Sequence, residues 1–376
     1  MKILQVTPAL GQGGVERGTV EMAAYTVKQG ATSLVASQGG QMVQDLISTG
    51  ARHIILPLER RDPFTIFANA IKLKTIILQE KVSLVHARSR APAWAALLAC
   101  RLTGTPFLTT FHGTHRIQNR LKKLYNSSMV RGDRTIAISE FIKRHIITNY
   151  QLPEDRIDTA PRGCNPEFFS PTAISQEVLN ELRHSLGISS GEVVISLPGR
   201  LTRWKGQGLF LQALQKVADL PWKAVLIGGP EKKIAYLEEL RAQAVELGIA
   251  ERVVFVGDQS NIVPYYAISD IIVSASTEPE AFGRVAIEAQ AMAKPVIASA
   301  HGGSLETVRD GATGWLFESG NVDALAGKLR QCLSSDAERK EMGNRGRQWV
   351  KEHFTVEQMC QAEWETYLKV MNVDVN

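Results

Sequence analysis

The chain has 376 residues and a net charge of +5; 44% of its residues are hydrophobic and 22% are charged, as expected of a globular protein with two domains. No apolar run reaches the about 18 residues of a membrane span, and Pro8 and Gly11 interrupt the opening segment too early for a signal peptide. The four cysteines are far apart and lack CxxC spacing, which argues against a disulfide framework or a zinc site and favours a cytoplasmic protein.

In the first half, short apolar runs alternate with segments of helical periodicity. This alternation predicts an α/β architecture, with a parallel sheet covered by helices on both faces. The expected strands lie at 3–6, 32–36, 53–56, 83–87, 107–111 and 135–138, and the expected helices at 16–29, 65–79, 91–102 and 139–149.

The second half repeats this pattern with almost continuous apolar strands, as expected where both faces of a sheet are buried. The expected strands lie at 192–199, 222–229, 252–257, 270–276 and 294–300, and the expected helices at 205–218, 231–247, 284–293, 321–333 and 335–352. A stretch rich in Pro, Gly and Asn at 161–172 separates the halves. We therefore expect doubly wound domains at 1–172 and 173–354, followed by a C-terminal segment at 355–376.

The charge is divided unevenly between these halves. Residues 1–170 contain 22 Lys and Arg but only 12 Asp and Glu, so the rest of the chain is acidic on balance. A basic half suits an anionic partner such as nucleic acid, a phosphorylated lipid or an anionic membrane face. A merely solvated basic surface would explain the same charge.

Unusual residues fall where the expected strands end, and ligands of doubly wound sheets bind beyond the carboxyl ends of strands. These residues are Gly11–Gly14, His112-Gly113, Gly199-Arg200, Gly228-Gly229 and Glu280–Gly283. The coincidence predicts a substrate cleft between the two domains.

The segment GQGGVERG (11–18) follows the first strand and opens a helix, where backbone N–H groups favour an anion. Its spacing departs from the dinucleotide fingerprint GxGxxG, and the second strand ends in Ser37-Gln38 without the acid that would hold a ribose. We expect a loop that faces a phosphate or sugar, with a tight turn as the alternative.

The segment GRLTRWKGQ (199–207) carries Arg200 and Lys205 at the end of a strand. A planar guanidinium and a point-like ammonium together suit a diphosphate. A solvated basic turn is the alternative, and the position at a strand end weighs against it.

Glu280 and Glu288 flank Gly283, just before and within a helix that we expect to start near Arg284. Ionised carboxylates accept hydrogen bonds from sugar hydroxyls, and the first turn of a helix attracts phosphate. The arrangement predicts a nucleotide-sugar site. A helix that favours Glu in its first turns would explain Glu288 but not Glu280.

These motifs resemble glycosyltransferase family 4. The resemblance rests on Glu280-x7-Glu288 after Ser276, then KPVIAS, Gly302-Gly303 with Glu306, DGATGWLF (310–317), GGVER near the N-terminus, Gly199–Gly206 and Phe111–Gly113. It implies the GT-B fold, in which two Rossmann-like domains face each other across a cleft, and a retaining enzyme. The stretch LGQGGVERGTVEMA also resembles the lipopolysaccharide core mannosyltransferase branch.

The resemblance implies roles for individual residues. Arg200 and Lys205 would neutralise the leaving diphosphate, Glu280 would bind the transferred hexose, Glu288 the ribose, and His112 a donor hydroxyl. The implied catalytic residues are therefore His112, Glu280, Arg200 and Lys205, and the implied donor-binding residues are Gly13, Gly14, Arg200, Lys205, Glu280, Phe282, Gly283, Arg284, Val285 and Glu288. Arg162 replaces an Asn that is usual in the family, and we assign it no role.

Two expectations concern histidine and metal. A histidine beside a strand end is often structural; we favour a functional role for His112, next to Gly113, and a structural one for His115. The sequence has no DxD pair, so we expect neither a metal ion nor another cofactor. The departing phosphate would then accept the proton of the acceptor, as in front-face retention.

The implied fold assigns the acceptor to the basic first domain, which suggests an anionic glycolipid or glycan and peripheral contact with the inner face of the cytoplasmic membrane. The residues considered for this surface are Arg88, Arg90, Arg116, Arg120, Lys122, Lys123, Arg131 and Arg134. The C-terminal helix commonly crosses back to the first domain in this fold, where Trp364 and Tyr367 would pack.

Two other functions share these features. A GT-B sugar-nucleotide epimerase would turn over a nucleotide sugar without an acceptor, and a non-catalytic sugar-nucleotide-binding protein would not turn it over at all. Nucleic-acid binding is disfavoured because the basic half lacks the interleaved aromatic residues of a stacking platform.

Overall fold

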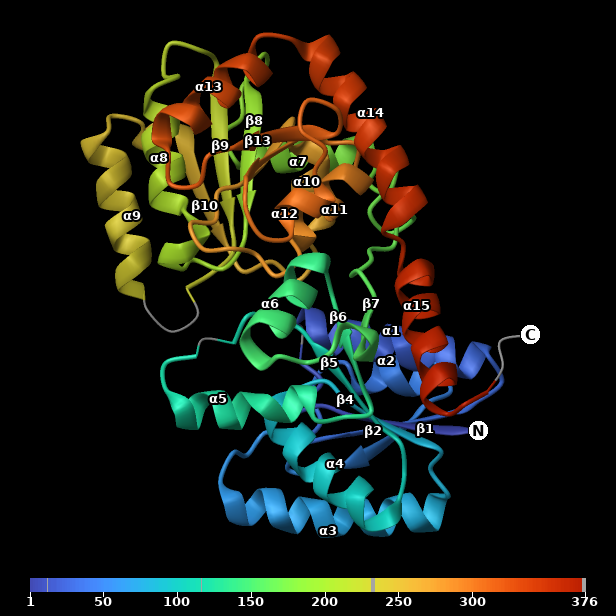
Figure 1. Ribbon diagram of the computed structural model, residues 1–376. Helices are drawn as coiled ribbons and strands as arrows, with labels where there is room; N and C mark the ends of the chain where they lie inside the picture. The colour runs from blue at the N-terminus through green and yellow to red at the C-terminus, as the bar shows by residue number, and fades with distance from the viewer. Residues whose placement is uncertain (12, 116, 231–233, 374–376) are drawn as a thin grey trace. The chain divides into compact units, whose positions relative to one another are not determined.

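The computed structural model describes residues 1–11, 13–115, 117–230 and 234–373. The chain divides into two compact units (Figure 1). The first unit is Met1–Arg162 together with Val356–Asn376, and the second unit is Gly163–Thr355.

The boundary lies ten residues before the position expected from the sequence, because residues 163–172 are tied to the second unit. Arg347 donates to the carbonyl oxygens of Pro166 and Phe169, at 3.2 Å and 3.0 Å. The ring of Phe169 packs edge-on against Tyr266, with ring centroids 6.0 Å apart.

Seven parallel strands form the sheet of the first unit, in the order β3-β2-β1-β4-β5-β6-β7. They are β1 (Lys2–Val6), β2 (Thr32–Ser37), β3 (Arg52–Ile55), β4 (Leu84–Ala87), β5 (Phe107–Phe111), β6 (Arg134–Ala137) and β7 (Ile157–Thr159). The order reverses direction between β1 and β4, the point at which sheets of this type bind ligands beyond the carboxyl ends of the strands. The sequence did not predict β7, whose three residues form no apolar run.

Helices cover both faces of this sheet. They are α1 (Gly14–Lys28), α2 (Val43–Ser48), α3 (Pro63–Glu80), α4 (Arg90–Thr103), α5 (Arg120–Asn126), α6 (Glu140–Tyr150) and α15 (Val356–Val370), with short 3-10 turns η1 (Ser127–Val130) and η2 (Glu154–Arg156). α1 and α15 pack on one face, where Met22, Tyr25, Trp364 and Tyr367 share a core with the strands. α3 packs along α4 (Figure 1).

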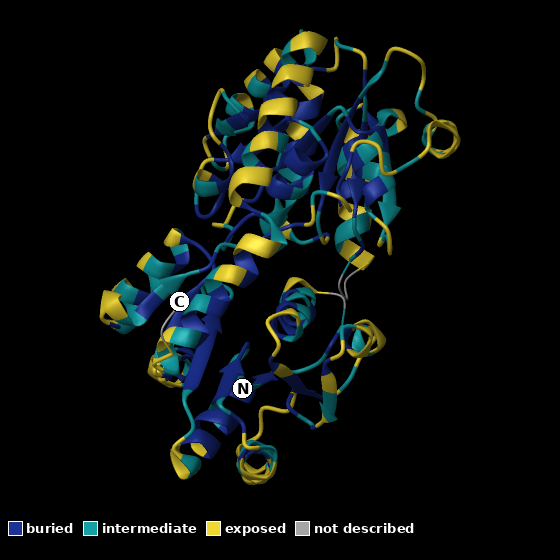
Figure 2. Ribbon diagram, turned by 90° about the vertical axis from the view of Figure 1, so that its right-hand side faces the viewer, coloured by how far each residue is buried: buried dark blue, intermediate teal, exposed yellow. Residues whose placement is uncertain are grey.

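Six parallel strands form the sheet of the second unit, in the order β10-β9-β8-β11-β12-β13. They are β8 (Val193–Pro198), β9 (Trp222–Ile227), β10 (Val253–Gly257), β11 (Ile271–Ser274), β12 (Val296–Ser299) and β13 (Gly314–Phe317). The order reverses between β8 and β11. The strands of both units are largely buried (Figure 2), as the continuous apolar runs predicted.

The helices of the second unit also lie on both faces of its sheet. They are α7 (Gln176–Ser185), α8 (Gln207–Gln215), α9 (Ile234–Glu246), α10 (Val263–Ile268), α11 (Arg284–Ala291), α12 (Ser304–Thr307), α13 (Val322–Leu333) and α14 (Asp336–His353), with 3-10 turns η3 (Arg203–Lys205) and η4 (Ala250–Arg252). The larger core joins α8, α9 and α13 to the sheet. The predicted α/β fold of two doubly wound domains is therefore confirmed.

Within the described ranges, no helix combines the length and the apolar character that are needed to cross a lipid bilayer.

Candidate functional site

The loops after β8 and β11 meet at the point where the strand order of the second sheet reverses. β8 and β11 are hydrogen-bonded neighbours, so their carboxyl ends lie side by side. Gly199 and Arg200 follow β8, and the segment 275–283 follows β11. The topology thus brings the two predicted groups, Arg200 with Lys205 and Glu280 through Gly283, to one edge of the sheet.

Lys205 and Glu280 form an ion pair at this edge. The Lys205 Nζ lies 2.5 Å from Oε1 of Glu280, and the two side chains are 16% and 13% exposed. The Ser276 hydroxyl donates to the same oxygen at 2.6 Å, and the ring of Trp204 lies 4.5 Å from the ammonium. The pair therefore has a fixed position and still reaches solvent.

Gly206 pins the loop after β8 to the end of β11. Its φ is 74°, and a Cβ at this position would lie 1.9 Å from the carbonyl oxygen of Ala275, so only glycine fits. Gln207, in the next position, donates to the carbonyl oxygen of Arg200 at 3.0 Å. These contacts hold the Arg200–Lys205 loop in place.

The N-terminus of α11 lies in the loop that carries Glu280. Gly283, with φ of 92°, precedes the helix, and Arg284 and Val285 begin its first turn. The first N–H groups of a helix have no partner within it and attract anions. The side chain of Phe282 is buried against Phe354, with ring centroids 5.7 Å apart, so the ring anchors this loop.

Glu288 is held by two donors, neither of which the sequence identified as its partner. The Tyr266 hydroxyl donates to Oε2 at 3.2 Å, and Arg284 Nη2 donates to Oε1 at 3.0 Å. Burial, and then the Glu288 charge, raise the pKa of Tyr266 well above its ordinary value, so the phenol keeps its proton. The carboxylate is oriented while each oxygen retains further acceptor capacity.

His301 follows β12 and was not predicted. Its Nε2 lies 2.9 Å from the carbonyl oxygen of Ser276, so this nitrogen carries the proton and donates. The other ring nitrogen, Nδ1, is buried and has no hydrogen-bond partner among the described residues. The imidazole therefore presents an acceptor close to the segment that carries Glu280.

The first unit carries the other three predicted residues. Gly13 and Gly14 lie after β1, beside the reversal between β1 and β4, and Gly14 is the first residue of α1. His112 directly follows β5, and its Nε2 is buried with no partner among the described residues. Burial, followed by the charges of Arg162 and Arg88, holds the pKa of His112 well below its ordinary value, so its ring is neutral.

His115 fits the structural role that the sequence predicted. Its ring packs against Phe111 with centroids 4.9 Å apart, and its carbonyl oxygen accepts from Asn126 at 3.2 Å. Burial lowers the pKa of His115 to about 3.

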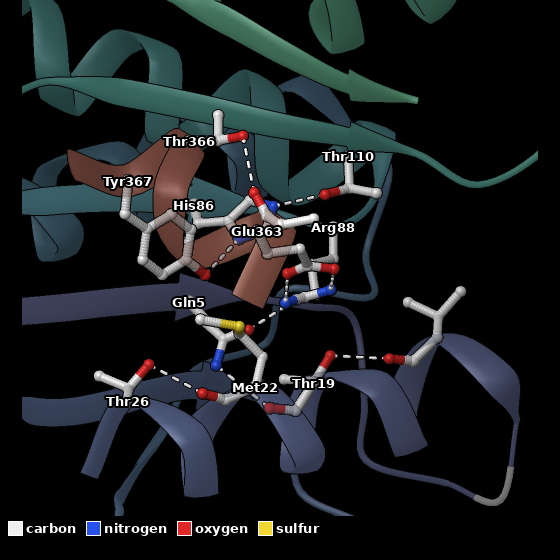
Figure 3. A network of polar contacts seen from close by, with 12 residues as sticks. Gln5, Thr19, Met22, Thr26, His86, Arg88, Thr110, Glu363, Thr366 and Tyr367 are labelled. Carbon is white, nitrogen blue, oxygen red and sulfur yellow. Dashed lines mark hydrogen bonds and ion pairs between the residues drawn. The ribbon is translucent and has the colours of Figure 1, made fainter. Parts of the chain in front are cut away.

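A buried polar network lies beneath α1 in the first unit (Figure 3). Arg88 Nη2 lies 2.5 Å from Oε2 of Glu363 on α15, and Arg88 Nε donates to Gln5 at 2.6 Å. His86 joins Tyr367 at 2.8 Å and Thr110 at 2.7 Å. The network ties three neighbouring strands to α15.

Arg162, which the sequence left without a role, is anchored to the start of α1. It donates to the carbonyl oxygen of Gly14 at 2.5 Å and lies 4.0 Å from Glu363. A Cβ on Gly18 would lie 2.0 Å from its guanidinium, so the second glycine of GVERG makes room for this side chain. Arg162 thus holds the first turn of α1.

The predicted anion-binding surface needs correction at three residues. Arg88 is fully buried in its pair with Glu363, and Arg134 pairs with Asp158 at 2.5 Å. Arg90 is half-buried and donates to Asn126 at 3.0 Å. Arg116 lies outside the described residues. Arg120, Lys123 and Arg131 are exposed and Lys122 is half-buried, so these four remain on the surface.

Comparison with known proteins covers both units. The family described as "Glycosyl transferases group 1" matches residues 179–349, and "Glycosyltransferase Family 4" matches residues 12–168. A crystal structure of a glycosyltransferase from Rickettsia africae ESF-5 is similar over 99% of both chains, with 38% identity and a TM-score of 0.91.

Two curated relatives are similar over part of the chain. A D-inositol 3-phosphate glycosyltransferase of Mycobacterium sp. (strain KMS) is 34% identical over 54% of this chain and 45% of its own length. A GDP-mannose-dependent alpha-(1-6)-phosphatidylinositol monomannoside mannosyltransferase of Mycolicibacterium smegmatis is 28% identical over 76% of both. The chain spans between 45% and 60% of the length of the first curated relatives that it matches.

The two matched regions together account for most of both units, and the Rickettsia structure matches them in a single chain. The chain therefore belongs to the group 1, family 4 glycosyltransferases and has their GT-B fold of two Rossmann-like domains.

Proposed function

We propose that this protein transfers a hexose from a nucleoside-diphosphate sugar to an anionic glycan or glycolipid, with retention of the anomeric configuration and without a metal ion. The observation that carries the proposal is the Lys205–Glu280 pair beside the N-terminus of α11, at the reversal point of the second sheet. The Lys205 ammonium there suits a diphosphate, and the Glu280 carboxylate suits a sugar hydroxyl. The N-terminus of α11 offers a second contact to phosphate.

The proposed reaction breaks the bond between the anomeric carbon and the diphosphate oxygen. Lys205, Arg200 and the first-turn N–H groups of α11 stabilise the charge on the departing diphosphate. This stabilisation needs little reorganisation of the protein, because the positions of these groups are already fixed. The acceptor hydroxyl forms the new bond on the same face of the sugar, and its proton passes to the departing phosphate. Glu280 accepts hydrogen bonds from the hexose, and Glu288 from the ribose.

We infer the donor sugar and the acceptor from the names of relatives and from the charge of the first unit. The mycobacterial relative is named for GDP-mannose and for a phosphatidylinositol mannoside, a combination of mannosyl donor and anionic glycolipid. The exposed cations Arg120, Lys123 and Arg131 suit an anionic acceptor such as lipopolysaccharide core. We therefore place the reaction at the inner face of the cytoplasmic membrane, with mannose as the first sugar to test.

The test is thermal stabilisation of the full chain by GDP, UDP and ADP. A ligand at about 100 times its dissociation constant adds about 2.7 kcal/mol to the folded state. We expect one nucleotide to raise Tm in the wild type and to lose most of this effect in Glu288→Ala. The exposed Glu181→Ala on α7 is the matched control and should respond like the wild type. Equal stabilisation of Glu288→Ala would contradict the ribose role.

A second experiment separates the alternatives of epimerase and binding protein. GDP-mannose and UDP-hexoses are incubated with and without acceptor glycolipid in the presence of EDTA. Transfer only with acceptor, undiminished by EDTA, supports the proposal. An isomerised nucleotide sugar without acceptor identifies an epimerase, and binding without any product identifies a sugar-nucleotide-binding protein.

A further inference from the structure

Helix α3 has an inner face that is accounted for by packing within the first unit. Asp62 caps the helix by accepting from Thr65 N at 2.8 Å, and Pro63 occupies its first turn. Four residues of the helix are buried, at the spacing of a core-facing stripe: Asn69, Ala70, Leu73 and Ile77. These four residues already form the one buried face that an ordinary surface helix has.

The opposite face of α3 is also apolar, although it faces solvent. Phe64 is 88% exposed, Phe67 64%, Ile71 45% and Leu78 57%. Intervals of three, four and seven residues put these side chains on one side of the helix. We call these four residues the outer face of α3. Two exposed aromatic rings and two exposed aliphatic side chains on one helix face indicate an interaction surface.

Basic residues outnumber acidic residues in and beside α3. Residues 59–81 contain five basic side chains, namely Arg60, Arg61, Lys72, Lys74 and Lys81. The same range contains three acidic residues: Asp62 caps the helix and lies 3.8 Å from Arg60, and Glu80 is paired with Lys2 and Arg52, at 3.0 Å and 2.9 Å. The third, Glu59, lies before the helix. Arg61, Lys72, Lys74 and Lys81 then outnumber Glu59, so this segment carries a net positive charge.

We propose that the outer face of α3 docks the protein on an anionic phospholipid bilayer, with Phe64 and Phe67 entering the interface between headgroups and acyl chains. An apolar helix face flanked by Lys and Arg lies in the plane of such an interface, and each cation near an anionic leaflet adds to the attraction. A two-fold pairing of this face with a second copy would bring the same cations together, which disfavours self-association. The proposal rests on the membrane placement in the proposed function and names the surface that makes the contact; the contact itself needs no sugar donor.

Vesicle flotation tests the surface directly. Full-length protein is mixed with vesicles of phosphatidylcholine alone or of phosphatidylcholine with phosphatidylglycerol, in the absence of nucleotide. We expect the wild type to float with the anionic vesicles. We expect the affinity of Phe64→Ser/Phe67→Ser for these vesicles to fall by at least about tenfold. The matched control is Ile234→Ser/Val245→Ser on α9, whose side chains are 70% and 68% exposed, and it should float like the wild type.

A labelled variant reports insertion rather than mere adhesion. All four native cysteines are buried, so an environment-sensitive dye on Ile71→Cys labels one site selectively. Its fluorescence should rise and shift to the blue on anionic vesicles. The same dye on Val245→Cys should keep its spectrum.

Three outcomes would overturn the proposal. One is equal flotation of the wild type and Phe64→Ser/Phe67→Ser. Another is an unchanged spectrum of the Ile71→Cys label on anionic vesicles. The third is a wild-type dimer in sedimentation velocity that the double serine variant converts to monomer, without vesicle binding by either, which would assign the face to a second copy. The rise in Tm of the serine variant with nucleotide is measured in parallel. A normal rise shows that the variant is folded and that its donor site is intact, so a loss of vesicle binding is not caused by failure of the donor site.

Discussion

Each unit contains a carboxylate–cation pair at 2.5 Å beside the reversal point of its sheet, but the two pairs differ in burial. Arg88 and Glu363 in the first unit are 0% and 1% exposed, whereas Lys205 and Glu280 in the second are 16% and 13% exposed. The residues of a fully buried ion pair cannot exchange each other for a ligand, because separating them would leave each charge buried without a partner or water. A pair that reaches solvent can share its charges with a ligand. The first pair is therefore structural, and the second belongs to the candidate site.

The largest effect on stability is expected from breaking the buried pair. Glu363→Ala leaves Arg88 charged and buried, and should lower the free energy of unfolding by about 3–5 kcal/mol. Urea denaturation followed by circular dichroism measures this. A loss no greater than that of the exposed control Glu352→Ala would remove the distinction between the two pairs.

The opposite pattern is expected at the Lys205–Glu280 pair, which reaches solvent. Lys205→Ala should change the free energy of unfolding by about 1 kcal/mol or less, because the pair reaches solvent and Ser276 still donates to Glu280. Its kcat/KM for sugar transfer should fall by about 10²–10³-fold, the size of losing one preorganised charge partner of the leaving group. A Lys205→Ala variant with lost stability and normal kcat/KM would reverse our assignment.

The contact of Arg162 with α1 can be tested by a double-mutant cycle. Gly18→Ala adds a Cβ against the guanidinium and should cost about 1–3 kcal/mol of unfolding free energy. In the Arg162→Asn background the same alanine has room, and its cost should largely vanish. Gly327→Ala on α13, where a Cβ meets nothing within 4 Å, is the matched control. Equal costs in both backgrounds would show that the two residues are not coupled.

The buried histidines of the first unit predict a pH dependence of stability. Burial holds the pKa of His86 and of His112 well below the ordinary value in the folded state. Below pH of about 6.5 the histidines of the unfolded chain bind protons that those of the folded chain do not. The contribution of these histidines to the free energy of unfolding is therefore fully present above this pH and is lost as the pH falls. From pH 6.5 to 5.5 each histidine therefore contributes about 1 kcal/mol, and at lower pH the slope approaches about 1.4 kcal/mol per pH unit.

Urea unfolding between pH 6.5 and 5.5 measures this slope. The variant His86→Gln, which keeps hydrogen-bonding groups but cannot titrate there, should remove one histidine's share of it. An unchanged slope in His86→Gln would contradict the assignment of a neutral, buried ring.

Much of the fold was predictable because the strands are buried on both faces and therefore read as continuous apolar runs. The exceptions are short edge strands: β7 has three residues, and the sequence treated β13 only as part of a motif. The grouping of Lys205 with Glu280 was also predictable, because both follow strand ends that a parallel sheet places at one edge.

Partners that lie far apart in sequence were not predictable. Arg88 and Arg120 are equivalent as sequence letters, but one is buried because Glu363, 275 residues later, lies against it. Arg162 gains its role from Gly14 and Gly18, about 150 positions away in the chain. No local pattern encodes such contacts.

The most direct test of the account is calorimetric titration of GDP-mannose and UDP-hexoses into the wild type, Lys205→Ala and the control Lys351→Ala, whose lysine is exposed on α14. We predict that one donor binds the wild type and Lys351→Ala alike, and that Lys205→Ala binds it at least about tenfold more weakly, a loss of about 1.4 kcal/mol. Equal affinity of Lys205→Ala and the wild type would contradict the central claim that the Lys205–Glu280 pair forms the donor site.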